Sequence, residues 1–298
     1  MSSFETEGQN FFARLDNSPA AIRAYLEERG LSAGKRFGQN FMVCQEVRAE
    51  LVASLGASAG SRVWEIGPGL GAMTAMCLDA KLHTTAFEID RGFVSHLQER
   101  FACESEFRLV PGDCLKTMPT EMRESSAPEF VLGNLPYNAA AQIIWYLLGR
   151  ENGAQRLVFT IQKEAADRML AAESSRSFGP LAILCNLEYE TRKIRTIPGE
   201  CFYPRPQVTS TAIALTRVRT VPHDTKTAIL AAADAAFSAR RKTLLNNFGK
   251  ALGDRPGAGR RLTAIGIDPS RRAESLQQAD FLKLAEAFPE LGQARMSS

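Results

Sequence analysis

The chain has 298 residues, of which 45% are hydrophobic and 23% charged, and its formal net charge is +3 at pH 7. This composition is ordinary for a globular protein, and the length favours one large domain plus a smaller one. No apolar run reaches the roughly 18 residues of a membrane-spanning helix. The N-terminal sequence MSSFETEGQN has neither a basic start nor an apolar core, so we expect no secretory leader.

Six cysteines are scattered along the chain, at positions 44, 77, 103, 114, 185 and 201. They form no C-x-x-C pair, and the three histidines offer no spacing for a zinc site. The cysteine pattern therefore predicts reduced, buried thiols in a cytoplasmic protein without a metal.

The charge is spread unevenly along the chain. Residues 219–298 carry 13 Lys and Arg against 8 Asp and Glu, whereas the remainder has a small acidic excess. A basic C-terminal part suggests a polyanionic partner. A solvated helical surface would give the same charge pattern.

The predicted elements begin with an N-terminal helical appendage over residues 1–33. Its clearest part is a helix over 18–30, which Ser18 caps. The sequence GKRFGQNF, residues 34–41, predicts a loop with two basic residues. An amphipathic helix is expected over 43–56, because its apolar residues recur at helical spacing.

Short apolar strands then alternate with helical segments. Five strands are expected, at residues 62–66, 84–89, 107–110, 130–134 and 156–161. Strands separated by helices favour an α/β fold with a doubly wound, mostly parallel, Rossmann-like sheet.

Two further strands, 188–197 and 210–218, are expected as an antiparallel addition at the edge of this sheet. Beyond them the sequence shows only helical patterns, at 223–238, 240–250, 258–265 and 275–287. The predicted organisation is therefore a sheet domain over 34–218 and a small all-helical domain over 219–298.

The stretch WEIGPGLGA places glycines between a strand and a helix. Gly67 and Gly69 allow a tight turn and a close approach of a ligand to the backbone. Glu88 ends the next strand, 21 residues after Gly67, where a carboxylate can accept hydrogen bonds from both ribose hydroxyls. Asp113 follows the third strand and can accept from an adenine amino group, or it can be a simple turn residue.

Glu65 lies just before the glycines and suits a cationic ligand. A diphosphate would need bare amides there, so an acidic residue favours S-adenosylmethionine with its sulfonium. The alternative role for Glu65 is that of a partner for the helix dipole.

The stretch GNLPYN follows the fourth strand and predicts a site for a target amine. The side-chain carbonyl of Asn134 and the main-chain carbonyl of Leu135 can accept from an exocyclic adenine amine, which favours the pyramidal geometry needed to attack a methyl group. Pro136 fixes the backbone, and Tyr137 offers a flat face for stacking a base. A tight turn with a packed tyrosine is the structural alternative.

These motifs resemble those of the small-subunit ribosomal RNA adenine N6,N6-dimethyltransferases, the kasugamycin-resistance family. The resemblance runs from about residue 34 to the C-terminus. It rests on KRFGQNF, EIGPGLGAMT, FEID, GDCL, GNLPYN, QKEAADRM, CFYPRPQVTS, AAFSARRKTLLNNFG and IGIDPSRRAESL.

The resemblance implies S-adenosylmethionine as cofactor and a role for each matching residue. Asn40 and Met42, where the family usually has leucine, would flank the cofactor. Gly67 would lie along its methionine and sugar part, Glu88 would hold the ribose and Asp113 the adenine. Asn134 to Tyr137 would form the target-amine site, and Phe202 would close the other face of the target base.

The resemblance also implies two adjacent adenines near the 3′ end of small-subunit ribosomal RNA as targets, each dimethylated, in a pre-30S particle. We expect a monomeric, cytoplasmic enzyme without membrane contact, coupled to subunit maturation. Arg240, Arg241 and Lys242 would contact phosphates, which position rather than specify.

Three rival functions stay open on the sequence. The first is a large-subunit adenine N6-methyltransferase of the macrolide-resistance type, which shares the sheet motifs but is expected to lack the helical tail motifs. The second is a non-catalytic RNA-binding factor for ribosome assembly. The third is an NAD-dependent oxidoreductase, suggested only by the glycines.

Overall fold

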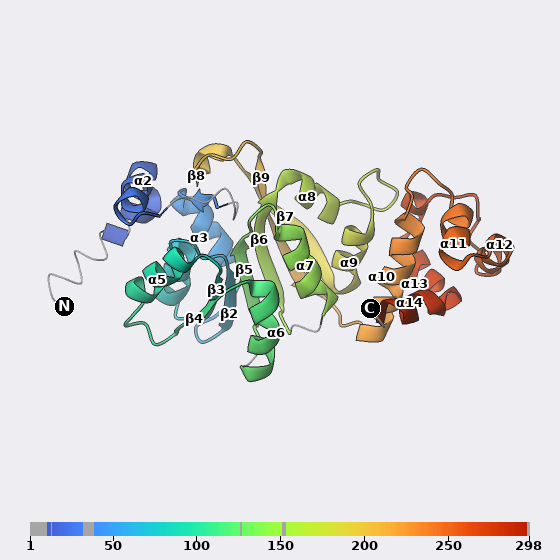
Figure 1. Ribbon diagram of the computed structural model, residues 1–298, viewed down its shortest axis with the longest axis horizontal. Helices are drawn as coiled ribbons and strands as arrows, with labels where there is room; N and C mark the ends of the chain where they lie inside the picture. The colour runs from blue at the N-terminus through green and yellow to red at the C-terminus, as the bar shows by residue number, and fades with distance from the viewer. Residues whose placement is uncertain (1–10, 13, 32–38, 126, 151–152, 297–298) are drawn as a thin grey trace. The chain divides into compact units, whose positions relative to one another are not determined.

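The computed structural model describes residues 11–12, 14–31, 39–125, 127–150 and 153–296 (Figure 1). The predicted basic loop at 34–38 and the first ten residues lie outside this description. The chain divides into two compact units. One comprises Met1–Ile144, Asn152–Ala166 and Arg192–Thr216, and the other comprises Trp145–Glu151, Asp167–Thr191 and Arg217–Ser298.

A seven-stranded sheet has the order β4-β3-β2-β5-β6-β9-β7. The strands are β2 (Arg62–Ile66), β3 (His83–Glu88), β4 (Phe107–Pro111), β5 (Phe130–Asn134), β6 (Arg156–Gln162), β7 (Tyr189–Ile197) and β9 (Ser210–Arg217). The first five pair in parallel, and β9 pairs antiparallel with β6. The predicted mostly parallel, doubly wound sheet is thus confirmed, as is the location of the last two strands at its edge.

The order of the strands places the point where the winding direction reverses between the neighbouring strands β2 and β5. The chain passes from β2 to β3 to β4 through α4 (Ala72–Asp79) and α5 (Arg91–Arg100), then returns through α6 (Cys114–Glu124) to β5 on the other side of β2. Because strand–helix–strand connections are right-handed, the helices of connections that run in opposite directions along the sheet lie on opposite faces of the sheet. Ligands of such sheets bind outside the carboxyl ends of the strands where the direction reverses, which here are the ends of β2 and β5.

The central strands are buried along almost their whole length, as expected for parallel strands covered on both faces. Val63, Leu132 and Val158, from β2, β5 and β6, pack in one core with Val47 and Leu51 of helix α3 (Gln45–Ser54). The apolar face predicted for residues 43–56 is therefore the face that covers the sheet.

The N-terminal segment packs on the sheet unit through α2 (Pro19–Glu28), whose Ser18 cap accepts a hydrogen bond from the Ala21 amide at 3.2 Å. The helix predicted over 18–30 is confirmed. Residues 11–12 and 14–17 are also helical and lie within the helical appendage predicted over residues 1–33. Leu15 and Ile22 are buried in a cluster with two other residues of α2, Tyr25 and Leu26, and with four residues from later segments (Phe41, Val43, Leu70, Phe93).

A second, two-stranded sheet joins β1 (Phe41–Met42) to β8 (Phe202–Tyr203) in antiparallel register. Next to it, Cys44 and Cys201 form a disulfide with a Cα–Cα distance of 4.9 Å. The expectation of six reduced thiols is therefore wrong for this pair. The two cysteines are 157 residues apart in sequence, so only the fold brings them together. The remaining cysteines are free: Cys77, Cys103, Cys114 and Cys185.

The second unit is built mainly from helices. They are α9 (Pro180–Glu188), α10 (His223–Phe237), α11 (Leu244–Leu252), α12 (Arg255–Ala264), α13 (Gln278–Ala287) and α14 (Pro289–Met296), while α7 (Ala140–Gly149) and α8 (Lys163–Met169) are divided between the units. The four predicted helices after residue 222 are confirmed, and α14 is an addition. Within this unit Lys226 forms a buried ion pair with Glu188 at 2.8 Å. None of the described helices is long and apolar enough to span a membrane.

Candidate functional site

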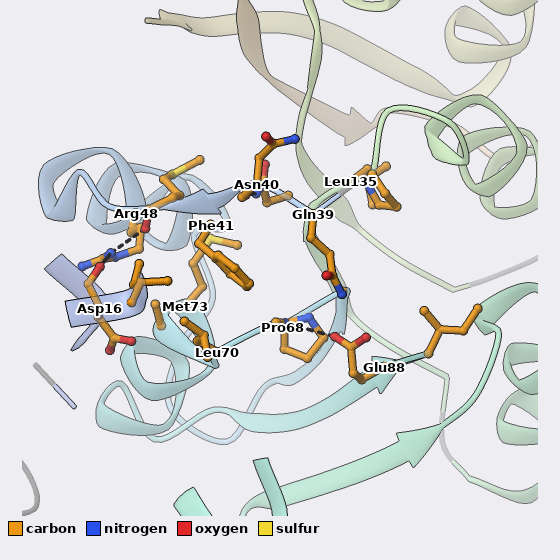
Figure 2. Close-up of a pocket in the computed structure, with 18 of the residues that line it drawn as sticks. Asp16, Gln39, Asn40, Phe41, Arg48, Pro68, Leu70, Met73, Glu88 and Leu135 are labelled. Atoms are coloured by element: carbon orange, nitrogen blue, oxygen red, sulfur yellow. Dashed lines mark hydrogen bonds between the residues drawn. The ribbon is translucent and has the colours of Figure 1, made fainter. Parts of the chain in front are cut away.

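A cavity lies at the carboxyl ends of β2 and β5, inside the sheet unit (Figure 2). The empty space within it, open mouth included, is about 850 Å³. Its walls come from the segment before β1, β1 itself, the glycine turn after β2, the end of β3 and the turn after β5. The lining residues include Asn40, Phe41, Met42, Gly67, Pro68, Gly69, Leu70, Met73, Glu88, Asn134, Leu135, Pro136 and Tyr137.

The turn after β2 requires glycine at two positions. Gly67 and Gly69 have φ angles of 71° and 58°, in the left-handed region that side chains disfavour. A Cβ at Gly69 would also lie 3.1 Å from the ring of Phe41. Among the described residues beyond its two chain neighbours, none has a heavy atom within 4 Å of a Cβ built at Gly67, so a ligand can approach the backbone there.

Glu88 is fixed at the cavity wall by main-chain amides. Its Oε2 accepts from the Gly69 amide at 3.1 Å and its Oε1 from the Asp90 amide at 2.9 Å. The side chain is only 3% exposed, and burial raises its pKa to about 7 despite these hydrogen bonds. Asp90, not Glu88, caps the next helix, by accepting from the Gly92 amide at 2.8 Å. Glu88 is therefore a desolvated acceptor that is held toward the cavity and has no capping role.

The turn after β5 is tied to two other segments. Asn134 donates from Nδ2 to the main-chain carbonyl of Asn40 at 2.7 Å, so its Oδ1 is the atom that can accept from a ligand. The Tyr137 hydroxyl lies 2.7 Å from Oγ of Ser210, which is fully buried. Burial raises the pKa of Tyr137.

Close packing of β5 against β2 brings the two halves of the cavity together. A Cβ at Gly133 would lie 2.7 Å from Cδ2 of Leu135 and 3.1 Å from the carbonyl oxygen of Ile66. Glycine is therefore needed just before Asn134, and the carboxyl end of β5 can lie directly beside that of β2.

Three of the predicted site residues lie away from the cavity wall. Glu65 is fully buried and accepts from Thr74 Oγ1, in the first turn of α4, at 2.5 Å; burial raises its pKa to about 7. Asp113 caps α6 by accepting from the Leu115 amide at 3.0 Å. Phe202 is 3% exposed and packs in the core that includes Met42.

Several lining residues are absent from the sequence prediction, among them Asp16, Ile22 and Arg48. Arg48 is 2% exposed and donates to the carbonyl of Met42 at 2.6 Å and to that of Asp16 at 2.7 Å. The one sequence signal for it is its place beside Val47, on the buried face of the helix predicted over 43–56.

The predicted RNA-contacting residues belong to the helical unit. Arg240, Arg241 and Lys242 are all exposed, immediately after α10. Arg240 differs from its neighbours because it donates to the carbonyls of Arg176 at 3.1 Å and Phe178 at 3.0 Å. Arg240 therefore also holds a loop within its own unit.

The fold and the site define a class of protein: α/β enzymes that bind a nucleoside-containing cofactor at the switch point of the sheet. The model of the ribosomal RNA adenine dimethylase family matches residues 30–290, and the chain belongs to this family. The resemblance seen in the sequence motifs is thereby confirmed.

Curated relatives match along most of the chain. A protein of Treponema denticola named ribosomal RNA small subunit methyltransferase A is 36% identical over 92% of this chain and 96% of its own length. The protein of the same name from Treponema pallidum is 40% identical over 91% of this chain and 96% of its own length.

Two solved structures share the fold. A dimethyladenosine transferase from Plasmodium falciparum superposes with a TM-score of 0.70 at 21% identity, covering 83% of this chain and 96% of its own. The 23S rRNA methyltransferase ErmE superposes with a TM-score of 0.61 at 18% identity, covering 83% of this chain and 99% of its own.

S-adenosylmethionine is the cofactor of this family, and the residues of the cavity fit it. Glu88 presents a desolvated carboxylate suited to hydroxyl donors. The positive-φ glycines leave room against the backbone, and Phe41, Leu70 and Met73 supply apolar wall for the uncharged parts.

Proposed function

We propose that this protein methylates N6 of adenines in small-subunit ribosomal RNA. The relatives that are 36% and 40% identical over more than nine tenths of the chain carry that substrate in their names. The structural observation behind the proposal is that Asn134 and Tyr137 line the same cavity as Glu88. An amine acceptor and an aromatic ring therefore face the place where a nucleoside cofactor fits.

Within this proposal, residues of four segments hold the cofactor, which supplies an electrophilic methyl group on its sulfonium. Glu88 accepts from the ribose hydroxyls, and Gly67 allows close approach of the backbone. Asn40 and Met42 flank the same space, since they line the cavity on the β1 side. Asp113 caps α6 and lies outside the cavity wall in the described conformation, but its carboxylate keeps acceptor capacity for the adenine amino group.

Asn134 and Leu135 are proposed to act on the target adenine. The exocyclic amine is a weak nucleophile because its lone pair is delocalised into the ring. When Oδ1 of Asn134 and the Leu135 carbonyl accept its two hydrogens, the nitrogen can become pyramidal and direct its lone pair at a methyl group. No strong base is needed, because the proton leaves after the nitrogen has gained positive charge. The hydrogen bond to Asn40 orients the Asn134 amide for this role.

Tyr137 and Phe202 are proposed to hold the flipped-out base between them. The Tyr137 ring is oriented by the contact of its hydroxyl with Oγ of Ser210 at 2.7 Å. Phe202 is buried in the described conformation, so closing the second face requires its ring to turn out of the core. Extracting a base costs a few kcal/mol, and stacking on an aromatic ring returns about 1–3 kcal/mol.

We further propose two adjacent adenines as targets, each dimethylated, within a precursor of the small subunit, and a monomeric enzyme in the cytoplasm. Arg241 and Lys242 are proposed to contact phosphates from the helical unit. The basic excess of residues 219–298 supports this assignment.

The test of the proposed substrate compares small-subunit and large-subunit ribosomal particles from cells that lack the modification. Each is incubated with the purified protein and labelled S-adenosylmethionine, and its nucleosides are separated by mass. We expect N6,N6-dimethyladenosine from the small subunit alone. Methylation confined to the large subunit would establish the rival function instead.

A further inference from the structure

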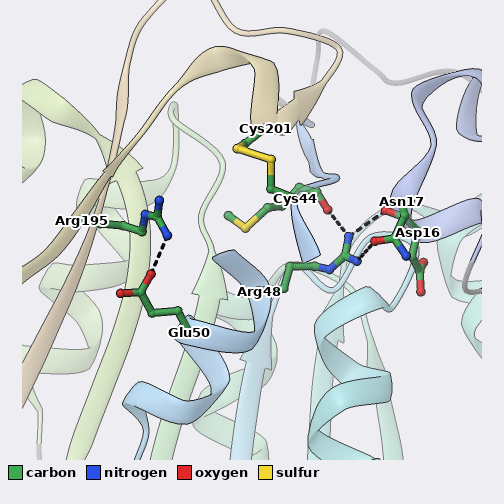
Figure 3. Close-up of a disulfide and its surroundings, with 8 residues drawn as sticks. Asp16, Asn17, Cys44, Arg48, Glu50, Arg195 and Cys201 are labelled. Atoms are coloured by element: carbon green, nitrogen blue, oxygen red, sulfur yellow. Dashed lines mark hydrogen bonds and ion pairs between the residues drawn. A yellow bond between two sulfur atoms is a disulfide. The ribbon is translucent and has the colours of Figure 1, made fainter. Parts of the chain in front are cut away.

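The disulfide between Cys44 and Cys201 lies next to the wall of the cofactor cavity. Cys44 comes two residues after Met42, which lines the cavity, and Cys201 directly precedes Phe202, which pairs with Met42. The bond therefore links the C-terminal end of β1 to the N-terminal end of β8. Figure 3 shows it beside Arg48, whose guanidinium reaches the segment that contains Asp16 and Asn17.

Strand β1 has little secondary structure to hold it. It comprises two residues, and its only partner in the two-stranded sheet is the equally short β8. An isolated two-stranded sheet is at best marginally stable in water. Noncovalent contacts add to it: the Val43 amide donates to the Cys201 carbonyl at 2.8 Å, and Arg48 donates to the Met42 carbonyl.

Strand β1 contacts both the cofactor cavity and the segment that positions Asn134. Phe41 and Met42 line the cavity, and the carbonyl of the preceding Asn40 accepts the hydrogen bond from Asn134. A shift of β1 therefore changes the cofactor cavity and the orientation of the Asn134 amide together.

We propose that Cys44 and Cys201 are positioning residues whose disulfide, when it forms under oxidising conditions in the otherwise reducing cytoplasm, holds β1 as the rigid wall of the methyltransferase site. The inference rests on the proposed role of this cavity in cofactor and adenine binding. Preorganisation removes an ordering cost that the ligand would otherwise have to overcome. The oxidised protein accordingly binds S-adenosylmethionine more tightly than the reduced protein.

The cross-link forms by thiol–disulfide exchange. One thiolate attacks a disulfide oxidant such as glutathione disulfide, giving a mixed disulfide and one glutathione thiol. The second thiolate then displaces the other glutathione. The two cysteines lose two protons and two electrons in total, and glutathione disulfide is reduced to two thiols. A dithiol such as dithiothreitol reverses the reaction.

The test uses the full chain as wild type, Cys44→Ser, Cys201→Ser, the double variant, and Cys103→Ser as a matched control at an exposed free thiol. Alkylation under denaturing conditions, followed by mass measurement, counts the free thiols with and without prior reduction. Calorimetry then gives the dissociation constant for S-adenosylmethionine. The thiol count does not depend on any ligand, so it tests the cross-link even if the proposed function fails.

Unreduced wild type should show two fewer alkylated thiols than reduced wild type. Reduction should raise its dissociation constant about tenfold, a change equivalent to 1.4 kcal/mol. Each serine variant should show the same weakening without reductant, and the double variant should be no worse than either single, because each single change already removes the bond. Cys103→Ser should match wild type.

Three results would overturn the proposal. The first is an equal thiol count before and after reduction. The second is a dissociation constant that does not change when the bond is reduced. The third is additive losses in the double variant, which would assign the effect to packing of each side chain and not to the cross-link.

Discussion

Asn134 and Asn40, 94 residues apart in sequence, are joined by a hydrogen bond of 2.7 Å from the side-chain amide of the first to the main-chain carbonyl of the second. The bond connects the carboxyl end of β5 to the segment that leads into β1. It gives the nitrogen and the oxygen of the Asn134 side-chain amide different roles. Nδ2 anchors the turn, and Oδ1 is the atom that we propose accepts from the target amine.

Cofactor affinity should depend on pH through Glu88. Burial raises the pKa of Glu88 to about 7, and only the carboxylate can accept from both ribose hydroxyls. The dissociation constant for S-adenosylmethionine should therefore fall about tenfold between pH 6 and pH 8. Calorimetry across this range measures it. Glu88→Gln should bind weakly with a flat profile, and an unchanged affinity in this variant would contradict the ribose assignment.

The ligand-free protein should become less stable as the pH rises, although its affinity for the cofactor increases. Burial raises the pKa values of Glu65 and Glu88 to about 7, above their ordinary value of 4.5. The folded state thus binds more protons than the unfolded state between these values, so the free energy of unfolding should fall as pH rises from about 5 to 8. Each group can contribute up to about 3 kcal/mol. Urea denaturation at the two pH values measures the change, and Glu65→Gln should reduce it.

Tyr137→Phe should separate orientation of the ring from stacking. The ring remains, so single-turnover methylation should fall only severalfold, whereas Tyr137→Ala should lose most of the rate. The Phe variant leaves the buried Ser210 hydroxyl without its partner, which should cost about 1–3 kcal/mol of unfolding free energy. The double variant Tyr137→Phe with Ser210→Ala should recover stability. A Phe variant as inactive as the Ala variant would show that the hydroxyl itself acts in the reaction.

Charge reversal at Arg241 and Lys242 should weaken RNA binding and flatten its salt dependence, by about 0.7–0.9 in slope for each phosphate that the protein no longer neutralises. Arg240→Glu should in addition lower the unfolding free energy, because its guanidinium holds the carbonyls of Arg176 and Phe178. Filter binding over a range of salt concentrations, with thermal unfolding in parallel, separates the two effects. An unaltered salt slope in the Arg241 and Lys242 double variant would exclude the phosphate role.

Local sequence patterns predict much of this fold because they coincide with tertiary burial. The strands expected at 62–66 and 130–134 are found with those bounds, since each apolar run ends at a glycine or an asparagine that must turn. The positions of Gly67 and Glu88 at the cavity were likewise predictable, because these positions depend on where strands end. Pairings over long sequence separation were not, as the Cys44–Cys201 bond illustrates.

The charge of a side chain is a poor guide to its location when the fold buries it. Arg48 carries a charge but is only 2% exposed, and its guanidinium donates to the main-chain carbonyls of Asp16 and Met42, which the fold brings to it. Conversely, the Glu65 carboxylate has the chemistry to bind a cationic ligand. Because Glu65 lies within the buried strand β2, its carboxylate instead accepts a hydrogen bond from the Thr74 hydroxyl of α4. Sequence indicates which groups are available, and the packing of β2, β5 and β1 decides which of them face the cavity.

The most direct test of the proposed methyl transfer is single-turnover methylation of small-subunit particles by Asn134→Ala, with Gln142→Ala, an exposed amide on α7, as control. The proposed role of Asn134 predicts a fall in rate of about a hundredfold or more, as for the loss of one preorganised transition-state hydrogen bond. RNA affinity should be nearly unchanged and S-adenosylmethionine affinity only modestly lower, while Gln142→Ala matches wild type throughout. A wild-type methylation rate in Asn134→Ala would contradict this role and leave the turn after β5 with a structural role only.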